Sequence, residues 1–134
     1  MKIAFITPFP PYRGGISKHS ENLYLELSKI SNLKVYNFIK QYPDILFPGK
    51  HQYNTTNNIH NEYNMVRSIH SFNLFTWKNT ARDILKSNYD SVLIRYWNPF
   101  FIPCYYYIIN YIKKRNPNIK IFAICDNIIP HENF

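Results

Sequence analysis

Two adjacent glycines, Gly14 and Gly15, end a proline-rich segment (PFPPYRGG, 8–15) and precede a predicted helix. Glycine loses more backbone entropy on folding than other residues and buries no side chain, so a pair needs a local reason. One reason is close approach to a ligand, because N–H groups at a helix N-terminus favour phosphate or pyrophosphate. The other is a tight turn. Neither GxGxxG nor GxxxxGKS occurs, which argues against classical dinucleotide and P-loop sites.

A second group of polar residues follows the last predicted strand and comprises Asp126, Asn127, His131 and Glu132. In a parallel sheet this group lies on the same edge as the glycine pair, where open α/β sheets bind ligands. A carboxylate and an imidazole there could orient ligand hydroxyl groups or move a proton. The alternative is turn chemistry, in which Asp126 and Asn127 hydrogen-bond the backbone and Pro130 fixes the bend.

Aromatic side chains are concentrated in the second half of the chain and could serve either binding or packing. Together with Arg95 they could form one wall, and they comprise Tyr96, Trp97, Phe100, Phe101, Tyr105, Tyr106, Tyr107 and Tyr111. Aromatic faces can stack on sugars or contact lipid, and they also fill protein cores. The core is the commoner place for such residues.

Alternating strands and helices must position these groups. Continuous apolar runs predict strands at 2–7, 33–39, 91–97 and 120–124, because strands covered on both faces lack alternation. Apolar residues at helical spacing predict helices after Gly15, at 75–86 and at about 103–114. This order predicts an α/β fold, a Rossmann-like open parallel sheet with helices on both faces. The asparagine-rich segment 48–64 is predicted to be irregular.

The helices also carry predictions of which side chains face inward. The first is expected to bury a stripe of Ile16, Ser20, Leu23, Leu27 and Ile30. The second is expected to bury Trp77, Ala81, Ile84 and Leu85, and the third Tyr106, Ile109 and Ile112. Each set repeats every three or four residues, which places its members on one helix face.

Composition bounds the class of protein. The chain has 134 residues, of which 46% are hydrophobic and 18% charged, enough for one packed domain. No apolar run is long enough to cross a bilayer and the start lacks a signal-peptide cleavage site, so we expect a cytoplasmic protein. Cys104 and Cys125 have no metal-ligand or disulfide pattern, and both thiols are expected to be reduced and largely buried.

The net charge of +8 favours anionic partners. The basic residues are scattered, and their one compact run, Lys113 to Arg115, falls where the third helix should end. Cations there complement the helix dipole. We therefore expect no nucleic-acid partner, and peripheral contact with anionic lipid at the inner face of the membrane is compatible with the charge.

Four segments in order resemble the N-terminal domain of glycosyltransferase family 4, the retaining group-1 glycosyltransferases. They are PPYRGGISKHS (10–20), FNLFTWKNTAR (72–82), SVLIRYWNPFFIP (91–103) and ICDNIIPHE (124–132). The resemblance covers nearly the whole chain. It implies the N-terminal, acceptor-side half of a GT-B fold, which faces a second Rossmann-like domain that binds most of a nucleotide-sugar donor.

The resemblance also assigns site residues. It places Gly14 and Gly15 against the donor diphosphate and His19 near the acceptor. Many members carry a histidine with a catalytic or donor-orienting role where this chain has Asp126, and an ionised aspartate cannot donate a hydrogen bond. Asp126 is the catalytic candidate on this basis. The remaining cleft residues implied are Arg13, Asn127, His131 and Glu132.

The expected whole is one incomplete domain, residues 1–134, whose C-terminal donor domain is missing and which does not turn over alone. The implied partners are a nucleotide sugar and a glycan or lipid-linked acceptor, with no metal and no other cofactor. Two alternatives remain. The chain could be a non-catalytic α/β module that binds an anionic ligand, or an inactive gene remnant whose uncovered last strand promotes association.

Overall fold

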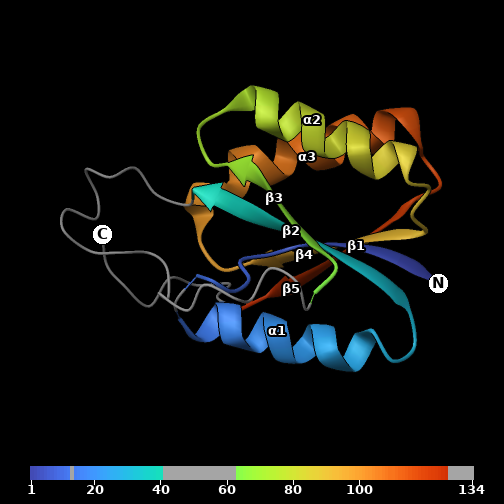
Figure 1. The fold of residues 1–134 in the computed structure, drawn as a ribbon. Coiled ribbons are helices and arrows are strands. Elements are labelled where there is room, and N and C mark those ends of the chain that lie inside the picture. The colour runs from blue at the N-terminus through green and yellow to red at the C-terminus, as the bar shows by residue number, and fades with distance from the viewer. Residues whose placement is uncertain (13, 41–62, 127–134) are drawn as a thin grey trace.

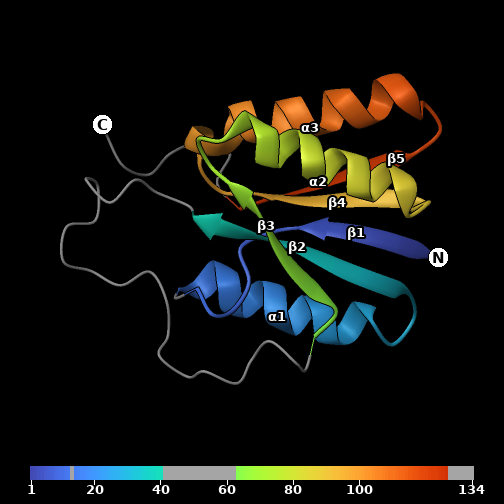
Figure 2. The same ribbon diagram turned by 45° about the horizontal axis from the view of Figure 1, so that its top comes forward.

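The computed structural model describes residues 1–12, 14–40 and 63–126, and these form a five-stranded parallel sheet in the order β3-β2-β1-β4-β5. The strands are β1 (Lys2–Ile6), β2 (Asn32–Lys40), β3 (Met65–His70), β4 (Ser91–Tyr96) and β5 (Lys120–Cys125). Helix α1 (Gly15–Leu27) covers one face, and α2 (Leu74–Lys86) and α3 (Ile102–Arg115) cover the other (Figures 1 and 2). A short 3-10 helix, η3 (Pro99–Phe101), leads into α3. The predicted Rossmann-like open sheet is confirmed.

Strand β1 lies in the middle of this sheet and shows why its sequence is apolar throughout. Ile3 and Phe5 pack in the cluster on the α1 side, whereas Ala4 and Ile6 belong to the cluster under α2 and α3. All four are buried. A strand covered on both faces has no solvent side for polar residues, so the continuous run is the expected pattern.

Strand β3 is a correction to the sequence analysis, which assigned no strand there. It pairs with β2 in parallel, with register shifts between Asn37 and Phe38 and between Phe38 and Lys40. Of its six residues only Ile69 is buried. An edge strand that is half exposed tolerates polar residues such as Arg67, so the segment lacks the apolar run by which the central strands were recognised.

The predicted helix faces hold for α2 and are partly wrong for α1 and α3. In α2 the buried residues include Trp77, Ala81 and Ile84, as predicted. The residue Ile30 lies beyond the end of α1 and is 78% exposed, and the face of α1 that is buried carries Ser17, Ser20 and Tyr24. In α3 the predicted Tyr106 is 69% exposed and its buried residues, besides the predicted Ile112, are Cys104, Tyr105 and Ile108.

Most of the aromatic concentration serves the core. Phe38 of β2 makes edge-to-face contacts with Trp97, Phe101 and Tyr105, at centroid distances of 5.4 to 6.4 Å. Such pairs contribute beyond their buried area. Tyr106 is the clearest exception, since most of its side chain is exposed.

Of the two cysteines, one is buried and one is exposed. Cys104 is buried, and burial raises the pKa of its thiol to about 12. Cys125 is exposed, so the expectation of two buried thiols is wrong for it, because the last residue of the edge strand β5 has no covering element among the described residues.

Lys113 to Arg115 form the last turn of α3, as predicted. Among the described residues no helix is both long and apolar enough to span a bilayer.

Candidate functional site

The carboxyl ends of the strands and the start of α1 lie at one edge of the sheet (Figures 1 and 2). The strand order changes direction at β1, since β2 and β3 lie to one side of it and β4 and β5 to the other. In open α/β sheets this switch point leaves a crevice outside the strand ends, where ligands bind. The site is therefore sought among side chains from β1, β4, β5 and α1.

A buried arginine occupies this edge and pairs with Asp126. Arg95, near the end of β4, donates from Nε to Oδ2 of Asp126 at 2.7 Å and from Nη2 to Oδ1. The arginine side chain is 4% exposed and the aspartate side chain 24% exposed. Two parallel bonds to one carboxylate fix the plane of the guanidinium. Asp126 follows β5, so the pair ties the ends of two neighbouring strands together.

The third guanidinium nitrogen of Arg95 contacts helix α1. Nη1 lies 2.6 Å from Nδ1 of His19 and 3.4 Å from Oγ of Ser20. Ser20 Oγ in turn lies 2.7 Å from Oγ1 of Thr7, which donates to the carbonyl of Pro8 at 3.0 Å. Each hydroxyl has one proton, so the chain runs from Arg95 through Ser20 and Thr7 to the backbone.

Four segments distant in sequence thus meet in one polar cluster, defined here as Thr7, His19, Ser20, Arg95 and Asp126. Thr7 and Ser20 are fully buried and His19 is exposed. A buried polar network with its hydrogen bonds satisfied rigidifies its surroundings. The cluster is therefore rigid at its buried core, and His19 and Asp126 are its two exposed members.

The glycine pair lies one turn before His19, at the start of α1. Gly14 is the N-cap, with φ +118° and ψ 166°, a conformation that residues with a side chain rarely adopt. A Cβ added at Gly14 or Gly15 would meet no atom of the described, non-neighbouring residues within 4 Å. The helix starts with no side-chain cap and no acidic residue in its first turn. The described residues therefore leave these N–H groups accessible to an anion.

Asn37 of β2 holds the loop that leads to the glycines. Its Oδ1 accepts from the N–H of Phe9 at 3.1 Å, and its Nδ2 donates to the carbonyls of Phe9 at 2.9 Å and Pro10 at 3.4 Å. Asn37 is fully buried. A buried loop backbone needs such partners, because it has no strand or helix to supply them.

Ser17, also in the first turns of α1, is buried without a partner. It is 2% exposed, and its Oγ is the one buried side-chain polar atom of the described residues with no hydrogen bond. Burying a hydroxyl without replacing its bonds to water costs free energy. The sequence alone cannot predict this, since serine is common in helix first turns for other reasons.

Replacing Ser17 by alanine is expected to raise the free energy of unfolding by about 1 kcal/mol, because it removes a buried hydroxyl that gains nothing in the fold. Denaturant unfolding measures it. Ser20→Ala is the matched control on the same helix face, and should lower stability because Ser20 is hydrogen-bonded. Loss of stability in Ser17→Ala equal to that in Ser20→Ala would contradict the assignment.

The structure brings together four of the residues that the sequence singled out. Gly14, Gly15 and His19 begin α1, and Asp126 is linked to His19 through Arg95. The other predicted cleft residues, Arg13, Asn127, His131 and Glu132, lie outside the described residues. Arg95 was predicted only as part of a possible stacking wall with the aromatic residues, and its bonds to Asp126 and His19 were not predicted. A signal was present, because it is a charged residue inside an apolar strand.

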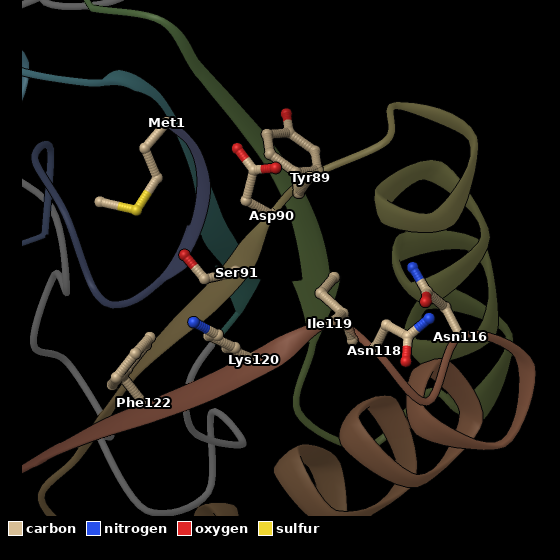
Figure 3. A pocket seen from close by; sticks show the side chains of 9 residues that line it. All are labelled: Met1, Tyr89, Asp90, Ser91, Asn116, Asn118, Ile119, Lys120 and Phe122. Carbon is tan, nitrogen blue, oxygen red and sulfur yellow. The ribbon is translucent and has the colours of Figure 1, made fainter.

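A surface hollow of about 460 Å³ lies at the opposite edge, near the amino ends of β1, β4 and β5 (Figure 3). Its lining includes Met1, Ser91, Lys120 and the half-exposed Phe122. Its one carboxylate, Asp90, accepts from the backbone N–H of Lys2 at 2.6 Å. None of the residues predicted to bind a ligand lines this hollow, so we place the candidate site at the carboxyl edge.

Within the described parts of the chain no group of three or more metal-binding side chains occurs. No protein-family model matches the chain, and no curated protein matches it significantly. Fold and site together define an α/β protein with a Rossmann-like parallel sheet and a polar cluster at its switch point.

Proposed function

We propose that the chain is the acceptor-side, N-terminal domain of a retaining glycosyltransferase of the GT-B type. The enzyme transfers a sugar from a nucleotide-sugar donor to a glycan or lipid-linked acceptor. A second, donor-binding domain completes the site in this proposal. The ordered resemblance of four segments to glycosyltransferase family 4 supports it, and so does the location of Gly14, Gly15, His19 and Asp126 at one edge of the sheet.

The observation that carries the proposal is the uncapped start of α1 at the switch point. Of the described residues, none outside the adjoining chain lies within 4 Å of a Cβ built at Gly14 or Gly15, and the helix presents N–H groups there with no acidic side chain in its first turn. A donor diphosphate matches both the charge and the donors. A plain tight turn needs glycine at Gly14, where φ is positive, but gives no reason for glycine at Gly15.

Gly15→Ala separates these two roles and gives a direct test. The new Cβ clashes with none of the described residues, and alanine favours the helix, so stability should stay equal or rise by up to about 1 kcal/mol. In the proposal the methyl group lies where the diphosphate approaches. Binding of uridine diphosphate, followed by NMR titration, should weaken by about tenfold, which corresponds to ~1.4 kcal/mol.

Gly14→Ala is the control, because it forces a side chain into a positive-φ conformation and should cost about 1–3 kcal/mol of stability regardless of any ligand. In the wild-type titration the shifted amide signals should be those of 14–17. Shifts confined to the hollow of Figure 3, or equal affinity of Gly15→Ala and wild type, would refute the proposed site.

Sugar transfer is tested on the full-length protein that the natural gene encodes. The coding sequence after Phe134 should encode a second Rossmann-like domain, and that protein should release nucleoside diphosphate from a nucleotide sugar when an acceptor is present. Binding without turnover by such a protein would favour the non-catalytic module instead.

A further inference from the structure

His19 contacts a group that can only donate hydrogen bonds. Its Nδ1 lies 2.6 Å from Nη1 of Arg95. A guanidinium carries five N–H donors, has no acceptor and stays charged in proteins. Nδ1 must therefore be the acceptor, and the proton of the neutral ring is on Nε2. The tautomer of His19 thus follows from the identity of residue 95.

The position of Arg95 follows in turn from Asp126. The carboxylate takes the Nε and Nη2 side of the guanidinium, which leaves Nη1 to contact α1. Ser20 lies near the same Nη1, at 3.4 Å. Because the guanidinium is planar, fixing one side of it fixes the direction of Nη1. A lysine in the same place would offer no such plane.

We propose that Arg95 and Asp126 are positioning residues that hold His19 as the Nε2–H tautomer, so that this ring presents one N–H donor at the carboxyl edge of the sheet. His19 is exposed, and no described residue hydrogen-bonds its Nε2. The inference gives Asp126 a role through His19 in place of the direct catalytic role expected from the sequence.

The fixed donor suits an oxygen acceptor. In this respect the inference rests on the proposed function: the ligand atom is a hydroxyl or phosphate oxygen of the nucleotide sugar or the acceptor. An ionised Asp126 cannot donate a hydrogen bond, whereas His19 in this tautomer can. The site therefore keeps a donor although it carries an aspartate at the position where the resemblance implies a histidine.

The test is nitrogen-15 NMR of the whole chain with labelled histidine, at alkaline pH, where an unperturbed imidazole is neutral. His19 signals are assigned with His19→Gln. The wild type should show only Nε2–H His19. In Asp126→Asn and in Arg95→Lys a measurable fraction of Nδ1–H His19 should appear. Asp126→Asn removes the carboxylate that orients the guanidinium, and Arg95→Lys removes the planar guanidinium itself. Each variant is first shown to be folded by its dispersed amide spectrum.

Asp83→Asn is the matched control. Asp83 also binds a cation, Lys34, at 3.2 Å, but on the other face of the sheet, so this variant should leave His19 unchanged. An Nδ1–H population in the wild type, or identical His19 spectra in the wild type, Asp126→Asn and Arg95→Lys, overturns the inference. If His19 behaves as expected while uridine diphosphate shifts no signal at 14–17, the positioning stands and the proposed function fails.

Discussion

Replacing Asp126 by alanine is expected to lower the free energy of unfolding by about 3 kcal/mol. The reason is what the substitution leaves behind. The Arg95 side chain is only 4% exposed, and without this carboxylate it becomes a buried charge with no counter-ion among the described residues. Breaking a buried pair from one side costs far more than the pair itself contributes, because desolvation of the remaining charge is no longer offset. Denaturant unfolding followed by circular dichroism measures the loss.

Asp83→Asn serves again as the comparison. Asp83 pairs with Lys34, but its side chain is 49% exposed, and exposed pairs contribute about 1 kcal/mol or less. Both variants remove one carboxylate charge. In Asp83→Asn the amide oxygen can still accept from Oη of Tyr36, which Asp83 does at 2.6 Å, so this variant loses only the charge of an exposed pair. If Asp126→Ala proves no more destabilising than Asp83→Asn, the ion pair at the end of β5 does not hold Arg95.

Replacing Asn37 by leucine is expected to lower the free energy of unfolding by about 3 kcal/mol as well. The leucine has nearly the same size but cannot hydrogen-bond the backbone of Phe9 and Pro10. These groups then remain buried without partners, and each such group costs about 1–3 kcal/mol. The loop before Gly14 also loses its attachment to β2, so amide signals at Gly14 and Gly15 should broaden or shift in the folded variant.

Asn64→Ala is the control for this substitution. The side chain of Asn64 also donates to a backbone carbonyl, that of Leu33, at 3.0 Å, but the residue is exposed. Water can replace that bond, so the loss should stay near 1 kcal/mol or below. Equal losses in Asn37→Leu and Asn64→Ala, or unchanged signals at Gly14 and Gly15, would show that Asn37 does not hold the loop.

The candidate site was predictable where a residue type is conspicuous by itself. Two adjacent glycines before a helix, and an aspartate just after a strand, are visible without any knowledge of neighbours. The bonding within the site was not predictable, because Arg95 lies 76 residues from His19 and 31 from Asp126 along the chain. Asn37 likewise reads as part of a strand, and its contact with Phe9 depends on the loop folding back over β2.

The sequence by itself determined the class of fold. Strands buried on both faces must be apolar throughout and helices that cover them must be amphipathic, so β1, β4 and α2 leave a local pattern. The edge strand β5 was recognised by its apolar run although none of its residues is buried. Other elements that are only partly buried, or whose buried face is set by distant contacts, left no such pattern in the sequence. β3 is half exposed at the edge, and the phase of α3, which buries Tyr105 and exposes Tyr106, depends on contacts with Phe38 and Trp97.

Tertiary structure alone decided the chemistry of the site. Parallel pairing brings the ends of β1, β4 and β5 to one edge, and there burial turns Arg95 from an isolated charge into the centre of a hydrogen-bonded cluster. Local sequence encodes periodicity because backbone geometry repeats every few residues. It does not encode which distant side chain satisfies a buried charge, since that partner is set by the crossing of whole elements.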